Sequence, residues 1–114
     1  MSAGAYDITC EQGATFNRTL TVKDSNGVVR DLSTYTARMH VRRTTSSAST
    51  FLELTTENGR LSVNSSGEIA LSISATDTAL LTDGGVYDLE IIDTSSNVER
   101  VVEGFFIVDL EVTR

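Results

Sequence analysis

The sequence contains no proline and no tryptophan, and it has only one cysteine (Cys10) and one histidine (His40). A single cysteine cannot form an internal disulfide, so the fold depends on its core or on its partners. Free cysteines are mostly buried, and we expect a buried, inert thiol at Cys10. The 114 residues are enough for one hydrophobic core, so we expect a single domain over residues 1–114.

Long apolar runs are absent as well. No stretch approaches the roughly 18 residues that a membrane span needs, and residues 1–12 lack the basic start and apolar stretch of a secretory signal. The net charge of −7 argues against binding to a nucleic-acid backbone, which requires clustered Lys and Arg. We therefore expect no membrane partner, no nucleic-acid partner and no leader.

The charge is distributed unevenly along the chain. Residues 1–43 contain six basic and four acidic groups (net +2), whereas residues 44–114 contain three basic and twelve acidic groups (net −9). This polarity would favour head-to-tail docking or a complementary partner, although a solvated acidic surface is the commoner explanation of such a charge pattern.

Turn signals and a period of two indicate an all-β protein. Hydrophobic residues make up 39% of the chain, Ser and Thr recur throughout, and Gly- and Asn-containing turns cut the sequence into short segments. Apolar and polar residues alternate within these segments, as in strands with one buried face. The clearest strands are expected at residues 35–42, 69–73, 87–91 and 106–112, and weaker ones at about 6–11, 15–23, 50–55, 60–64 and 98–103. We predict an antiparallel β-sandwich of about seven to nine strands.

One expected strand has an irregular pattern. In residues 15–23, Arg18 falls on the face that Phe16 and Leu20 define as apolar. A β-bulge, or a position at the edge of a sheet, would resolve the conflict.

A short helical turn is predicted near residues 75–81. Ser74 can cap it, because Asp77 follows three residues later as in a capping box, and Ala79 begins a short apolar turn. Gly84 can adopt the positive φ that ends a helix.

Tyr87 is the most informative aromatic residue. The stretch ISATDTALLTDGGVYDLEI resembles the E–F corner of immunoglobulin-like domains, in which a strand crosses between sheets and the next strand begins at a tyrosine. In that role the ring of Tyr87 would be buried while its hydroxyl bonds an upstream backbone group near Asp83; a core tyrosine without a corner role is the alternative. Since the paired cysteines and core tryptophan of antibody domains are missing, the resemblance implies only the sandwich architecture.

No active site is apparent in the sequence. His40 lacks a carboxylate or cysteine at a spacing that metal or triad chemistry uses, and no glycine-rich loop could cradle a phosphate. We expect a protein without enzymatic activity, cofactor or metal site. The most interesting surface feature is a basic row of Arg38, His40, Arg42 and Arg43, which could form an interface, an ordinary solvated strand face, or an edge protected by charge.

The order of motifs resembles that of small structural proteins of tailed bacteriophages. The carrying segments are ITCEQGATFNRTLTVKDSNG, DLSTYTARMHVRR, FLELTTENGRLSV, GVYDLEIID and VERVVEGFFIVDLEVTR. Similar layouts occur in the amino-terminal domain of phage baseplate upper proteins. The resemblance implies a non-enzymatic virion protein, made in the host bacterial cytoplasm and present in several copies.

Three functions follow as expectations. The first is a tail, baseplate or fibre-attachment adaptor that joins other virion proteins, and the second is a capsid decoration (cement) protein. A carbohydrate- or receptor-binding module is the alternative from another class, because β-sandwiches often present such sites on loops. That alternative requires exposed aromatic residues clustered at one end, whereas most aromatics here fall at core-facing strand positions.

Overall fold

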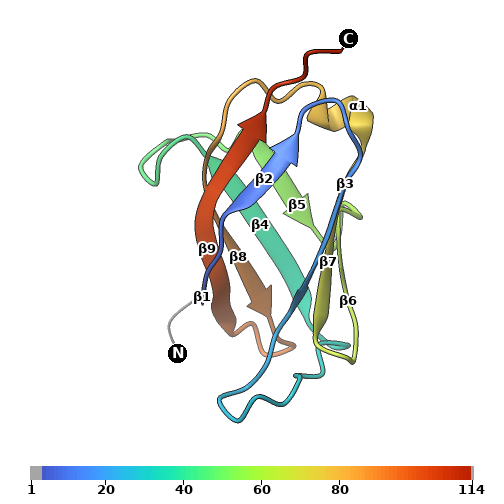
Figure 1. Ribbon diagram of the computed structural model, residues 1–114. Coiled ribbons are helices and arrows are strands. Elements are labelled where there is room, and N and C mark those ends of the chain that lie inside the picture. The colour runs from blue at the N-terminus through green and yellow to red at the C-terminus, as the bar shows by residue number, and fades with distance from the viewer. Residues whose placement is uncertain (1–3, 114) are drawn as a thin grey trace.

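The computed structural model describes residues 4–113, which form two packed β-sheets and one short helix (Figure 1). The elements in chain order are β1 (Gly4–Ala5), β2 (Ile8–Glu11), β3 (Phe16–Thr21), β4 (Thr36–Arg42), β5 (Leu52–Thr55), β6 (Leu61–Val63), β7 (Glu68–Ile73), α1 (Ala75–Thr78), β8 (Gly85–Ile92) and β9 (Val98–Asp109). Within this described range no helix is long and apolar enough to cross a membrane.

The two sheets differ in size. The larger has the order β1-β9-β8-β4-β5, with β2 also pairing with β9, and the smaller has the order β3-β7-β6. This arrangement agrees with the immunoglobulin sandwich, in which strands B, E and D share one sheet and strands C, F and G the other. The chain therefore has the predicted immunoglobulin-like β-sandwich fold.

One part of the prediction was wrong, because the sandwich is not entirely antiparallel. Both β1 and β2 pair with β9 in parallel, with Ile8 opposite Phe106 and Cys10 opposite Val108. Alternation has the same period in both kinds of ladder, so the sequence pattern could not distinguish them. As a result the first two strands lie entirely in the larger sheet, and the smaller sheet keeps only three strands.

Alternating side chains build the core between the sheets. Each long strand turns every second residue inward, as the burial of Ala37, Met39 and Val41 on β4 shows. Cys10 is fully buried, as predicted, and burial raises the pKa of its thiol.

The last strand differs from its prediction in the middle and at its C-terminal end. The segments expected at 98–103 and 106–112 form the single strand β9, which has a register irregularity where it passes Leu89 and Glu90 of β8. Its ladder ends at Asp109, so Leu110 and Val112 do not continue the apolar face. They are instead 61% and 92% exposed.

The helical turn forms where the sequence predicted it. The Ser74 side chain accepts a hydrogen bond from the Asp77 backbone N–H at 3.2 Å, which confirms the cap. Asp77 itself pairs with Arg60 at 2.8 Å, and this guanidinium lowers the pKa of the Asp77 carboxyl. The positive φ predicted at Gly84 was wrong; a glycine fits there because a Cβ would lie 2.2 Å from the Phe106 carbonyl oxygen.

Tyr87 is buried as expected, but its predicted hydrogen-bond partner was wrong. Its hydroxyl donates to the carbonyl of Tyr6, in the link between β1 and β2, and not to a group near Asp83. The register partner of Tyr87 on β9 is Gly104, and a Cβ at that position would lie 2.2 Å from the Tyr6 carbonyl oxygen. Tyr87 thus ties the first strands to the sheet and does not brace an E–F corner.

Candidate interaction face

The outer face of the larger sheet gathers the side chains that point away from the core. Because β4 and β8 are paired in register, their outward residues form rows across the strands. Arg42 lies opposite Val86, and Val86 lies opposite Phe105 of β9, so these three residues form one row. The next row places His40 opposite Asp88 and Asp88 opposite Glu103.

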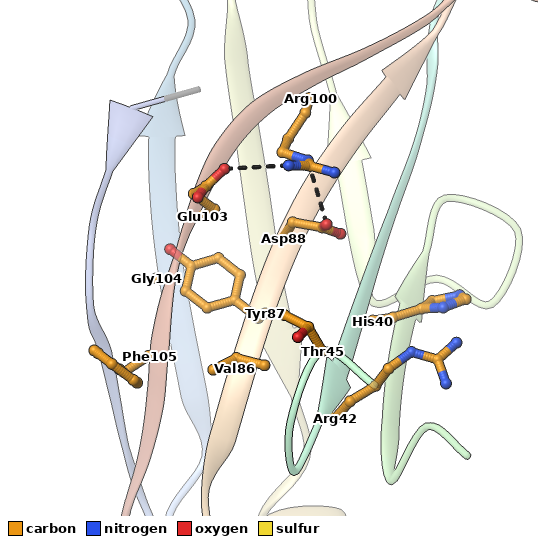
Figure 2. Close-up of a pocket in the computed structure, with 10 residues that line it drawn as sticks. All are labelled: His40, Arg42, Thr45, Val86, Tyr87, Asp88, Arg100, Glu103, Gly104 and Phe105. Carbon is orange, nitrogen blue, oxygen red and sulfur yellow. Dashed lines mark hydrogen bonds and ion pairs between the residues drawn. The ribbon is translucent and has the colours of Figure 1, made fainter. Parts of the chain in front are cut away.

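A shallow depression of about 470 Å³ lies over these rows (Figure 2). It is lined by residues of β4, β8 and β9 together with Thr45. Figure 2 shows Arg100 linked to both Asp88 and Glu103. The guanidinium lies 3.3 Å from an Asp88 carboxylate oxygen and 3.4 Å from a Glu103 carboxylate oxygen. One side of the depression is therefore a polar rim in which one arginine bridges two carboxylates.

Three members of the predicted basic row lie on this face, Arg43 follows the end of β4, and most of the row's charge is paired within the chain. Arg38 pairs with Glu90 at 2.8 Å, the imidazole of His40 lies 3.1 Å from Glu53, and Arg43 pairs with Asp83. The alternative of a charged edge strand was wrong, because β4 lies between β8 and β5. An interface role for the row stays a prediction.

Arg42 is the member of the row without a carboxylate partner among residues 4–113. Its guanidinium donates one hydrogen bond, at 3.0 Å, to the Ser47 backbone carbonyl, and the side chain is half-buried. The fixed fork of a guanidinium keeps further donors available for a carboxylate from another molecule. Arg42 is thus positioned to recognise an acidic group.

Large apolar side chains lie in the same region of the face, separated from Arg42 by Val86. Phe105 is 60% exposed and Ile107 46% exposed, and both project outward from β9 next to the half-buried Val86. A second depression, of about 400 Å³, adjoins them and is bordered by Arg43 and Asp83. Contiguous exposed apolar residues with a polar rim are typical of protein-binding surfaces. We call Phe105, Ile107, Val86 and Arg42 the Phe105 patch.

The groups that often carry chemistry in proteins were also located. Within residues 4–113 no group of three or more His, Cys, Asp or Glu side chains could hold a metal ion. The thiol of Cys10 is buried, and burial beside Tyr6 and Asp7 raises the pKa of the Tyr87 hydroxyl, which therefore stays protonated.

The sequence pattern did not predict the Phe105 patch. Phe106 and Val108 were assigned to the core face of the last strand, and both point inward, Phe106 fully buried and Val108 half-buried. The uninterrupted apolar run from Phe105 to Val108 could have indicated an exposed apolar surface, because strict alternation would place polar residues at 105 and 107.

The two-sheet architecture defines the protein as an immunoglobulin-like β-sandwich. No protein-family model matches the chain, and no curated protein does. Among solved structures it is similar to the four N-terminal Ig domains of Dscam1 isoform 7.44 (14% identity, TM-score 0.46), covering 96% of this chain and 24% of that one. It is also similar to Tim-1 (17% identity, TM-score 0.49), covering 100% of this chain and 99% of that one.

Proposed function

We propose that this chain is a non-enzymatic protein-interaction module that joins other proteins of a phage virion, as a tail, baseplate or fibre-attachment adaptor. The observation that carries the interaction role is the Phe105 patch, in which exposed apolar side chains lie across Val86 from an arginine without a carboxylate partner in the described chain. The virion role is supported by the order of sequence motifs that resembles small phage structural proteins.

The patch suits a protein partner of defined character. An aromatic or aliphatic side chain of the partner would pack on Phe105 and Ile107, and a carboxylate beside it would pair with Arg42. The bridged rim of Arg100, Asp88 and Glu103 would remain at the solvated border.

The arrangement of aromatics disfavours the carbohydrate-binding alternative. Phe16, Tyr87 and Phe106 are buried in the core, and the exposed Phe105 lies within a strand of the larger sheet. Sugar-binding on loops would require several exposed rings at one end of the sandwich.

Mass spectrometry of purified particles tests the virion role: the protein must be present in stoichiometric amounts, and its absence refutes the proposal. Cross-linking within the same particles identifies the neighbour, and a capsid neighbour would favour the decoration role over the tail role.

Particle incorporation of variants tests the patch. Phe105→Ser and Arg42→Gln should each lower the number of copies per particle at least tenfold, because residues at the centre of an interface dominate its affinity. Val28→Ser is the matched control, since Val28 is equally exposed but lies in the loop after β3. Full incorporation of both patch variants would place the contact elsewhere.

A further inference from the structure

The smaller sheet ends at β3, whose outer edge has no strand beside it in the part of the chain that the structure describes. β3 pairs only with β7, and the first two strands leave its edge uncovered because both pair with β9. The Val22 N–H donates to the Gly67 carbonyl, and strand residues alternate in the direction of their backbone groups. The N–H and C=O groups of Asn17, Thr19 and Thr21 therefore point to the open edge.

The edge of the larger sheet at β5 is covered by side chains of the chain itself. The Thr55 N–H donates to the Asn58 side-chain oxygen at 3.0 Å, and the Glu53 carbonyl accepts from Asn58 and Arg60 at 3.1 and 2.9 Å. β3 has no such cover within residues 4–113, and it contains no proline and no register irregularity. The usual protection of edge strands is missing at β3.

The inward side chains at this edge are incompletely covered. Ile69 of β7 is fully buried, whereas Leu20 of β3 and the following Val22 are only half-buried. A depression of about 330 Å³ lies beside them, is bordered by Val101 of the larger sheet and reaches Ile69 and the buried Leu89. A strand added to β3 would turn every second side chain into this apolar space.

Arg18 places a positive charge on the same face of β3, two positions from Leu20. Its guanidinium rests against the Phe16 ring at 5.3 Å and donates to the Tyr6 hydroxyl. It has no salt bridge within residues 4–113, and residues 16–23 contain no acid. Residues directly opposite on neighbouring strands lie on the same face, so an acidic residue opposite Arg18 would pair with it.

We propose that the edge of β3 binds an extended segment of a partner protein as one more antiparallel strand. The residues of this segment opposite Val22 and Leu20 are apolar and fill the depression, and the residue opposite Arg18 is acidic. All three lie on one face, so the segment reads apolar-x-apolar-x-acidic from its N-terminal end. Antiparallel pairing continues the order of β3, β7 and β6. This site is separate from the Phe105 patch, which lies on the larger sheet.

A synthetic peptide tests the proposal. The probe is the end-capped sequence Ser-Val-Thr-Val-Thr-Asp-Thr-Ser, whose valines fall opposite Val22 and Leu20 when its aspartate falls opposite Arg18. Saturating peptide should slow the hydrogen exchange of the Thr19 and Thr21 N–H groups at least about tenfold, because both gain an acceptor. NMR spectroscopy measures the exchange and, by titration, the affinity. Unchanged exchange of both groups at millimolar peptide would overturn the proposal.

Methylation of the peptide backbone separates strand addition from other kinds of contact. N-methyl groups on the two threonines between the first valine and the aspartate replace the hydrogens that face β3, whereas N-methyl groups on the valines point away from it. The first peptide should bind at least about tenfold more weakly, since two hydrogen bonds are lost. The second should bind like the unmodified peptide. Equal affinities of the two methylated peptides would contradict strand addition.

The pairing with Arg18 is tested by a double substitution. Arg18→Gln should weaken binding of the probe about three- to fivefold, the effect of a partly exposed ion pair. It should leave unchanged the affinity for a peptide with asparagine in place of the aspartate, and Arg18→Lys should restore part of the loss. The same loss with both peptides would show that the acid does not meet Arg18, and the proposed register would be wrong.

A second copy of this chain is the competing occupant of the edge. Thr19→Pro removes an edge N–H without removing a bond to β7, and Thr19→Val is the matched control that keeps this N–H. Thr19→Pro should bind the probe at least about tenfold more weakly and should sediment like the unaltered chain. A dimer of the unaltered chain that Thr19→Pro abolishes and Thr19→Val retains would assign the edge to a second copy and overturn the proposal.

Discussion

Tyr87 links the beginning of the chain to the centre of the larger sheet. Its hydroxyl reaches over Gly104 to the Tyr6 carbonyl, a partner 81 positions earlier in the sequence. Burial raises the pKa of this hydroxyl, and the nearby Tyr6 and Asp7 raise it further. The side chain thus acts as a neutral hydrogen-bond donor over the whole range in which the protein is handled.

Tyr87→Phe should lower the free energy of unfolding by about 1–2 kcal/mol, because it leaves the Tyr6 carbonyl without its buried donor. Chemical denaturation measures the change. Tyr35→Phe is a suitable comparison, since Tyr35 is only half-buried and its hydroxyl bonds Arg30 at 3.3 Å. Equal stability of Tyr87→Phe and the unaltered chain would show that the hydrogen bond contributes nothing.

The raised pKa of Tyr87 also predicts alkaline destabilisation. An unfolded chain loses the Tyr87 proton near the ordinary pKa of 10.0, whereas the folded chain retains it. The stabilisation is therefore complete below pH 10 and declines above it, by about 1.4 kcal/mol per pH unit for this one group. Denaturation at increasing pH should show a steeper decline for the unaltered chain than for Tyr87→Phe.

Residue-scale predictions from the sequence succeeded where the partner was local. The Ser74 cap depends on Asp77, three positions away, and it forms as expected. The hydroxyl partner of Tyr87 could not be found in this way, because Tyr6 becomes its neighbour only through the pairing of the first strands with β9.

Among the elements, β9 carries the most pairing. It hydrogen-bonds β8 on one side and both β1 and β2 on the other, so the first and last strands are held together. Gly104 lies at the crossing point, where the Tyr6 carbonyl occupies the space of a Cβ. The close fit makes this glycine a structural requirement of the element.

Gly104→Ala should destabilise the fold by about 2 kcal/mol or more, because the added methyl group forces the β1–β2 link away from β9. Gly4→Ala is the matched control on the same pair of strands: its nearest neighbour would be the Val101 carbonyl oxygen at 3.8 Å, an ordinary contact. It should change stability by less than about 0.5 kcal/mol. Thermal unfolding of both variants measures the difference, and equal losses would contradict the close approach.

Alternation located the strands but not their partners. The pattern identified segments that correspond to β2 through β9, and the irregular Arg18 correctly indicated a sheet edge as one of two alternatives, since β3 lies at the edge. Parallel pairing of β1 and β2, and the fusion of two expected segments into β9, depend on contacts between distant residues. Those contacts leave no periodic signal.

At the scale of the whole molecule, the buried Cys10 reports on the integrity of the sandwich. Its thiol is fully buried on β2, and burial raises its pKa, so both access and reactivity are low in the folded protein. A thiol reagent should label Cys10 only when the sheets separate, with the same denaturant dependence as global unfolding. Labelling that is fast and insensitive to denaturant would show that β2 opens by itself.

The candidate interaction face was predicted only in part. The basic row of Arg38, His40, Arg42 and Arg43 was expected on a polar strand face, and the structure places Arg38, His40 and Arg42 there, whereas Arg43 lies just after β4. The carboxylate partners of these side chains come from β5, β8 and the loop before β8. The sequence therefore could not predict that Arg42 lacks a carboxylate partner in the described chain.

Parallel pairing of β2 with β9 has a mechanical consequence. When the chain is pulled before Gly4 and after Thr113, β2 and β9 slide in opposite directions, and the bonds between them are stretched sideways together instead of opening one after another. A domain tethered at both ends would then resist tension until this ladder ruptures as a unit. Force spectroscopy should show one high rupture event, lowered in Gly104→Ala.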